Sequence, residues 1–168
     1  MQRIGIGRDI HRLVRGRALI LGGVQIPFHK GEAGHSDGDA LTHAIIDALL
    51  GASGTGDIGE LFPDTDGAYK NADSIALLKE AWRRIKETGA YEITNIDCIV
   101  SLEKPAILPY KQQIRQTIAA ALDVPVECIY VKGKTGERLG DTGKGRAVET
   151  FAAVLLRRQY TAGSGILG

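Results

Sequence analysis

The chain has little of three things, and each shortage argues against a class of partner. Aromatic residues make up only 5% of its 168 residues, which disfavours the stacking platforms that bind single-stranded nucleic acid. The net charge is only +1, so no excess of basic charge attracts nucleic acid or a membrane surface. No apolar run reaches the roughly 18 residues that a membrane-spanning helix needs. We therefore expect neither nucleic-acid nor membrane partners.

Cysteine is also scarce. The only two cysteines, Cys98 and Cys128, stand among apolar neighbours, a pattern typical of buried thiols rather than of a disulfide. The first residues lack the apolar core of a secretory signal peptide. Together these features predict a cytoplasmic protein, because thiols stay reduced in that compartment.

Predicted strands and helices alternate along the chain, which indicates an α/β (α+β) fold. Alternating apolar residues predict strands, whereas apolar residues at i, i+3 and i+4 predict helices. The predicted strands cover residues 3–11, a hairpin within 18–27, 91–102 and 129–132. The predicted helices cover residues 40–52, 74–88, 110–122 and 148–158. With no repeat or linker, we expect a single catalytic domain over residues 1–158, built on one mixed β-sheet with helices packed on one face, and a flexible tail over 159–168.

Two stretches carry side chains that bind metal. Asp9 and His11 end the first predicted strand, and positions i and i+2 of a strand project from the same face. The string His35-Ser36-Asp37-Gly38-Asp39 leads into the predicted helix that carries His43. One aspartate and two histidines would leave a Zn²⁺ ion one open position, as in catalytic zinc sites. The alternative is that Asp9 and His11 are ordinary polar residues at a strand end.

Three further features suit phosphates and sugars. His35 could donate a hydrogen bond to an anionic oxygen at the metal, or it could order only its own loop. The acidic residues between 57 and 66 suit sugar hydroxyls, or they could satisfy their own backbone in Asx turns. The glycine-rich turn over 132–137 offers N–H groups to phosphate, and Glu137 beside it favours a bridging Mg²⁺ or Mn²⁺. Without an evident nucleophilic serine or cysteine, this set favours metal-assisted phosphoryl chemistry in which the substrate supplies the nucleophile.

These motifs, in their order and spacing, resemble the 2-C-methyl-D-erythritol 2,4-cyclodiphosphate synthase family. The resemblance rests on Asp9-Ile10-His11, on HSDGD at 35–39, on LFPDTD at 61–66 and on the stretch 132–143. It implies a lyase of non-mevalonate isoprenoid biosynthesis. This enzyme converts 4-diphosphocytidyl-2-C-methyl-D-erythritol 2-phosphate to the cyclic diphosphate and releases CMP. The resemblance also implies a homotrimer with active sites between subunits, one Zn²⁺ per subunit, and a second divalent cation, Mg²⁺ or Mn²⁺.

The resemblance also implies roles for individual residues. The metal ligands that it implies are Asp9, His11, His43 and Glu137. The positions that stabilise the transition state are His35 and Thr135. The substrate-binding residues are Ser36, Asp57, Gly59, Phe62, Asp64, Asp66, Leu102, Ala106, Ile107, Leu108, Gly133, Lys134 and Lys144. Within this set, the stretches around 102–108 and 133–135 would enclose the cytosine from a neighbouring subunit.

Four charged residues depart from the family pattern, namely Arg8, Asp141, Lys144 and Arg146. In the family the corresponding positions cluster near the trimer axis, where an isoprenoid diphosphate is thought to bind. Because charged side chains disfavour an apolar tail, we expect weak or no binding of such a ligand by this chain.

Two alternatives from other classes stay open. A zinc-dependent phosphoesterase would hydrolyse simple phosphate esters, which the cyclase should not do. A non-catalytic nucleotide-binding or structural zinc module would need a closed four-ligand site, yet neither cysteine has metal-ligand spacing to the histidines.

Overall fold

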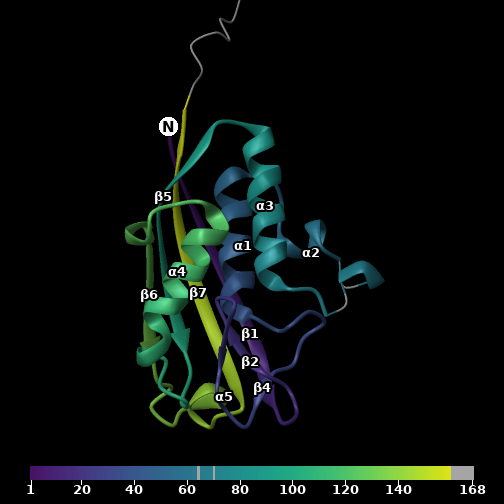
Figure 1. Cartoon of the computed structure of the whole chain (residues 1–168), viewed down its shortest axis with the longest axis vertical. Helices are drawn as coiled ribbons and strands as arrows, with labels where there is room; N and C mark the ends of the chain where they lie inside the picture. The colour runs from purple at the N-terminus through teal and green to yellow at the C-terminus, as the bar shows by residue number, and fades with distance from the viewer. Residues whose placement is uncertain (64, 70, 160–168) are drawn as a thin grey trace, which may run out of the picture.

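The computed structural model describes residues 1–63, 65–69 and 71–159. A mixed five-stranded sheet forms its frame (Figure 1). The strands lie in the spatial order β4 (Gly31–Glu32), β1 (Gln2–Val14), β7 (Ala147–Arg158), β5 (Tyr91–Ser101) and β6 (Ile129–Lys134). Only the β5–β6 pair is parallel. The predicted hairpin forms a separate two-stranded sheet of β2 (Leu19–Leu21) and β3 (Val24–Ile26).

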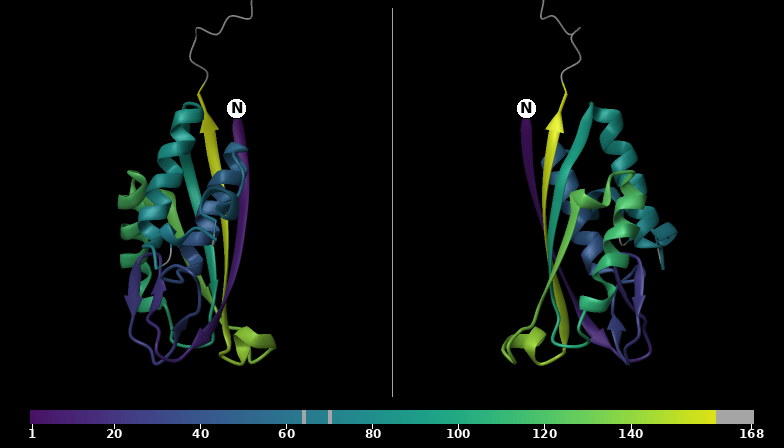
Figure 2. Two further views of the ribbon diagram at one scale, coloured as in Figure 1. Left: turned by 90° about the vertical axis from the view of Figure 1, so that its right-hand side faces the viewer. Right: turned by 60° about the vertical axis from the view of Figure 1, so that its left-hand side comes forward.

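The long helices pack on one face of the sheet, as predicted (Figure 2). The longer helices are α1 (Ala40–Ser53), α3 (Ser74–Thr88) and α4 (Lys111–Leu122). The shorter ones are α2 (Ile58–Leu61), α5 (Gly140–Gly143) and the 3-10 turns Gly67–Tyr69, Leu108–Tyr110 and Val126–Cys128. The hydrophobic core lies between these helices and the sheet. Within the described residues, no helix has the length and apolar character needed to cross a membrane.

The ends of α1 follow local rules that the sequence already displays. Asp39 caps the N-terminus by accepting the N–H of Thr42 at 3.0 Å, as expected for an aspartate at this position. The helix ends at Gly54, whose φ of 75° lies in the left-handed region that glycine tolerates. Gly51 lies inside the helix. These caps fix where His43 stands on the first turn of α1.

The segment expected to be a helix over residues 148–158 is wrong, because it forms strand β7. β7 pairs with β1 over eleven consecutive residues of each strand and with β5 on its other side. Its buried positions alternate, with Val148, Thr150 and Ala152 toward the helices. Phe151 and Leu155 project from the opposite face. Pairing with β1 and β5 therefore determines that this segment is a strand, because its apolar spacing alone fits both the helical and the strand period.

Strand β1 also extends to Val14, beyond the predicted end at residue 11. Its two glycines, Gly5 and Gly7, bring it against α1. A Cβ added at Gly7 would lie 1.9 Å from the carbonyl oxygen of Ala44, and one at Gly5 would lie 1.8 Å from that of Ala48. Only glycine permits this approach. The close contact brings the end of β1 beside the first turn of α1.

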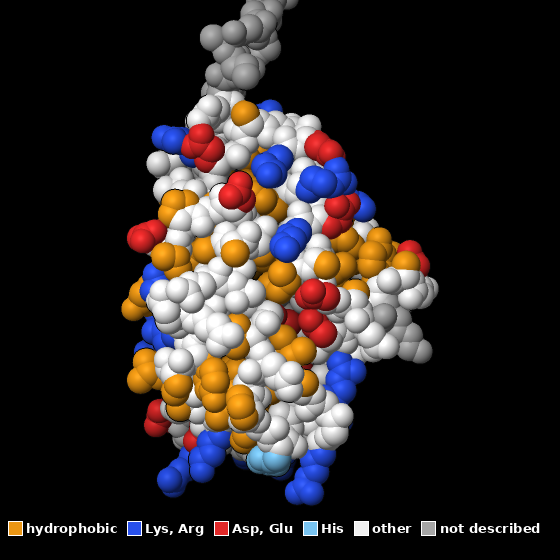
Figure 3. Space-filling view, viewed as in Figure 1, with side chains coloured by type: hydrophobic (Ala, Val, Ile, Leu, Met, Phe, Trp, Pro, Cys, Tyr) orange, Lys and Arg blue, Asp and Glu red, His pale blue; other side chains and the backbone are white. Residues whose placement is uncertain are grey.

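The sheet face away from the helices is exposed and partly apolar. Ile4 and Ile6 on β1 are 72% and 74% exposed, and Phe151 on β7 is 36% exposed. On the helical face, basic and acidic side chains lie intermixed near the upper end in Figure 3, in keeping with the small net charge. An exposed, partly apolar sheet face suits contact with another protein surface.

Candidate active site

Asp9, His11 and His43 converge where β1 meets α1. One carboxylate oxygen of Asp9, Oδ2, lies 3.0 Å from His11 Nε2 and 3.0 Å from His43 Nδ1. The potential ligand atoms of all three residues lie within 4.8 Å of one another. Their side chains are 14% to 26% exposed, so one side of the cluster stays accessible. The three residues expected to bind metal from strand and helix spacing are therefore brought together.

The electrostatics of the cluster suit a cation. Burial raises the pKa of Asp9, but hydrogen bonds from His11 and His43 outweigh it and hold this pKa well below its usual range. Burial lowers the pKa of His11, but the hydrogen bonds and charges of Asp9 and Glu32 raise it to about 10. Without metal, a proton on His11 balances the carboxylates. A divalent ion can replace that proton.

Hydrogen bonds orient both imidazole rings. His11 Nδ1 lies 2.7 Å from the carbonyl oxygen of Gly38, which can only accept, so Nδ1 carries a proton and Nε2 faces Asp9. His43 Nε2 lies 3.1 Å from Ser36 Oγ and 3.0 Å from Ser74 Oγ. Metal-binding histidines in proteins are commonly held in this way through their second ring nitrogen. Ser74 was not predicted, because it enters from α3 through tertiary packing.

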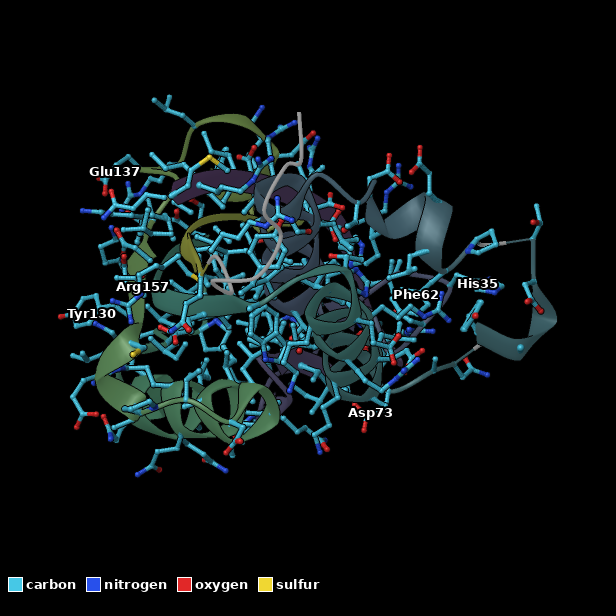
Figure 4. The ribbon with its side chains drawn as sticks, turned by 90° about the horizontal axis from the view of Figure 1, so that it is seen from above. His35, Phe62, Asp73, Tyr130, Glu137 and Arg157 are labelled. Carbon is cyan, nitrogen blue, oxygen red and sulfur yellow. The ribbon has the colours of Figure 1, made fainter. Side chains whose placement is uncertain are left out.

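A cavity of about 400 Å³ opens beside the cluster and is called the His43 cavity. Its size suits a small ligand. Seven of the predicted site residues line it, namely Asp9, His11, His35, Ser36, His43, Gly59 and Phe62. Figure 4 shows His35 and Phe62 close together at one edge of the molecule. The sequence motifs from β1, the HSDGD string, α1 and α2 thus meet at one site.

A second cavity, of about 320 Å³, lies elsewhere and is called the Thr135 cavity. Seven predicted residues line it, namely Leu102, Ala106, Ile107, Leu108, Gly133, Lys134 and Thr135. Thr135 Oγ1 donates a hydrogen bond to Glu137 Oε1. In Figure 4, Glu137 and His35 lie at opposite edges of the chain. The residues predicted for one site therefore form two separate groups within one chain.

Four predicted substrate residues lie in neither cavity or cannot be placed. Asp57 caps α2 by accepting the N–H of Glu60 at 2.9 Å, and Asp66 accepts the N–H of Ala68 at 2.9 Å. Both side chains thus satisfy local backbone, the alternative left open from the sequence. Lys144 is exposed at the C-terminal end of α5. Asp64 lies outside the described residues, as does the expected tail apart from Gln159, whose N–H donates to Ala90.

Two carboxylates near the metal cluster were not predicted. Asp47 lines the His43 cavity and accepts the N–H of Ile58 at 2.8 Å, and burial raises its pKa. It stands four residues after His43 on α1, so helical spacing could have revealed it. Glu32 lies behind His11 and is completely buried on the short edge strand β4. No local pattern marks that position, because its burial results from tertiary packing.

The sequence of this chain matches a known protein family. A model of the YgbB family matches residues 2–157. The chain belongs to this family. It is 53% identical to the 2-C-methyl-D-erythritol 2,4-cyclodiphosphate synthase of Treponema denticola, a match covering 95% of this chain and 98% of the relative.

Solved structures of related proteins share the fold. A 2C-methyl-D-erythritol-2,4-cyclodiphosphate synthase in its CDP-bound form has a TM-score of 0.84 and is 38% identical, and the match covers 92% of this chain and all of that structure. The bifunctional IspDF from Campylobacter jejuni has a TM-score of 0.90 and 42% identity, over 95% of this chain and 43% of that protein. The expected fold class and family are both confirmed.

Proposed function

We propose that this chain converts 4-diphosphocytidyl-2-C-methyl-D-erythritol 2-phosphate to 2-C-methyl-D-erythritol 2,4-cyclodiphosphate and CMP. An oxygen of the 2-phosphate attacks the β-phosphorus of the diphosphate. The bond from that phosphorus to the bridging oxygen breaks, and CMP leaves with the electron pair. The observation that carries this proposal is the convergence of Asp9, His11 and His43 at a ligand-sized cavity in a chain of the YgbB family.

The cluster has the chemistry of a zinc site. One carboxylate and two imidazoles match the donors that Zn²⁺ prefers, and three protein ligands leave a position for substrate. When bound, zinc would neutralise phosphate charge and make the attacked phosphorus more electrophilic. Asp9 and His11 hold their donor atoms on β1, and the first turn of α1 holds that of His43.

The remaining residues of the His43 cavity bind and orient the reacting groups. His35 and Ser36 stand beside the cluster on one loop, where their side chains can donate hydrogen bonds to phosphate oxygens. The buried, apolar ring of Phe62 lines the same cavity and would contact the carbon skeleton of the erythritol. These residues hold the two phosphate groups near each other, which reduces the entropy cost of ring closure.

The Thr135 cavity suits the cytidine end of the substrate. Its wall is largely apolar, with buried Leu102 and Ile107 flanking Gly133, which lies on strand β6 and not in the turn expected from residue 132. Glu137 beside Thr135 would supply a carboxylate to a second hard cation, Mg²⁺ or Mn²⁺, which would neutralise phosphate charge. Thr135 donates a hydrogen bond to this carboxylate, and its hydroxyl group would contact the phosphoryl group that is transferred.

One substrate molecule needs both groups of residues, yet a single chain separates them. A homotrimer resolves this if the Thr135 cavity of one subunit completes the His43 cavity of its neighbour. The exposed apolar sheet face with Ile4, Ile6 and Phe151 supplies a surface for that assembly. Light scattering at micromolar concentration should give three times the 18.0 kDa chain mass, and a monomer would contradict the assembly.

Both cysteines are free, which suits the reducing cytoplasm.

The test is a ³¹P NMR time course with the cytidyl diphosphate substrate, with and without a zinc chelator. CMP and a cyclic diphosphate should appear together. Chelation and the His43→Ala substitution should each abolish both products. Release of inorganic phosphate instead would indicate a phosphoesterase, and a folded, zinc-loaded chain without turnover would indicate a binding module.

A further inference from the structure

Among the residues that the structure describes, Glu32 is the one buried carboxylate that contacts both β1 and α1, the two elements of the metal site. It is 0% exposed. Its Oε2 accepts the N–H of Ala40 at 2.8 Å, at the start of the helix that carries His43. The same oxygen lies 3.5 Å from His11 Nδ1 on β1. Oε2 of Glu32 thus contacts both His11 and the start of α1, the helix that carries His43.

The contact with His11 is electrostatic. The Nδ1 proton is directed to the carbonyl of Gly38 at 2.7 Å, so the carboxylate at 3.5 Å acts on the ring mainly through its charge. Burial raises the pKa of Glu32 to about 8, and a cation bound beside His11 would favour the ionised carboxylate. The negative charge behind Nδ1 would then increase the electron density available at Nε2, the nitrogen that faces Asp9. Carboxylates behind metal-binding histidines raise ligand basicity in this way.

The second oxygen of Glu32 indicates that this carboxylate does not serve stability alone. Oε1 is buried and has no hydrogen-bond partner among the described residues. An unpaired buried carboxylate oxygen is unfavourable for folding, and an apolar residue of similar size would avoid that cost. Asp39, the neighbouring buried carboxylate, differs in this respect, because it accepts hydrogen bonds from Gly22, Gly23 and Thr42.

We propose that Glu32 is a positioning residue for the metal site, which strengthens zinc binding through His11 and through the N-terminus of α1. The proposal rests on the proposed function, because it takes the cluster of Asp9, His11 and His43 as a zinc site. It predicts that replacing Glu32 lowers zinc affinity without lowering the stability of the metal-free chain.

The experiment measures the zinc dissociation constant of the full chain by competition with a chromophoric chelator. Glu32→Gln keeps an acceptor for Ala40 but removes the charge, and we expect zinc affinity to fall about tenfold. Cobalt substitution supplies a spectroscopic readout, since the visible bands of Co²⁺ should shift with the donor strength of His11. The melting temperature of the metal-free variant should equal or exceed that of the wild type.

Two further variants distinguish the explanations. Glu32→Leu fills similar space without any acceptor, so it should bind zinc at least as weakly as Glu32→Gln and serves if the latter does not fold. Asp39→Asn alters the neighbouring buried carboxylate that caps the same helix, so it should lower both the melting temperature and zinc affinity, whereas Glu32→Gln lowers zinc affinity alone. Wild-type zinc affinity in both Glu32 variants would overturn the proposal. A wild-type chain that binds no zinc would instead refute the metal assignment on which it rests.

Discussion

Replacing Gly7 with alanine is expected to separate α1 from β1 and to disrupt the metal site. The added Cβ would lie 1.9 Å from the carbonyl oxygen of Ala44, and real Cβ atoms keep at least 3.0 Å, so a gap of at least about 1.1 Å must open. Ala44 is adjacent to His43, and Gly7 is two residues before Asp9. The displacement therefore changes the 3.0 Å contact between the two predicted ligands Asp9 and His43.

This displacement exceeds what a zinc site tolerates. Metal–ligand distances are held to about 0.2 Å, and a misplacement of about 1 Å can lower a rate on the order of 100-fold. Overpacking should also lower the free energy of unfolding by about 1–3 kcal/mol. We therefore expect Gly7→Ala to bind zinc at least about tenfold more weakly and to form cyclic diphosphate about 100-fold more slowly.

The matched control is Gly51→Ala in the same helix. A Cβ there meets nothing within 4 Å, and the residue is exposed. Alanine should raise the free energy of unfolding by about 0.5–1 kcal/mol through helix propensity and leave zinc binding unchanged. Chelator competition, the ³¹P assay and chemical denaturation measure the three quantities. Wild-type zinc affinity and turnover in folded Gly7→Ala would refute the argument that this close approach sets the site.

Four further predictions concern other parts of the site and the core. Arg17 donates to the carbonyl oxygens of Ser36 at 2.8 Å and of Glu32 at 3.0 Å, so Arg17→Met should raise KM severalfold and weaken zinc binding; an unaltered KM in steady-state kinetics would contradict this. Burial raises the pKa of Cys98 to about 12, so a thiol reagent at pH 8 should label only Cys128 in the folded chain, and two rapidly reacting thiols would be inconsistent with that burial. Because the folded pKa of Cys98 exceeds the unfolded value of 9.0, its contribution to stability is present below pH 9 and should be lost as pH rises toward 12, as chemical denaturation across that range can measure. Thr135→Val should lower turnover about 100-fold at unchanged stability, since the side chain is exposed, and near-normal turnover would exclude the catalytic role proposed for it.

Local chemistry explains which parts of the fold were predictable. Helix α1 begins at the side-chain hydrogen bond of Asp39 and ends at the left-handed backbone of Gly54. Both signals are local, so nothing beyond the segment is needed to predict that helix. The hairpin of β2 and β3 closes at Gly22 and Gly23, both with positive φ. The last strand was predicted as a helix because its apolar residues fit either period. Its partners β1 and β5 are distant in the sequence.

The sequence by itself determined the chemistry of the site. The Asp-x-His pair on a strand, the histidine one turn into a helix and the YgbB motifs fix which side chains can bind metal and phosphate, because strand and helix periods are local properties. Only the tertiary structure decided their arrangement. The glycine contact between β1 and α1 sets the ligand distances, and packing buries Glu32 behind His11. The same packing places the His43 and Thr135 cavities apart on one chain, because each arises from contacts between segments far apart in the sequence.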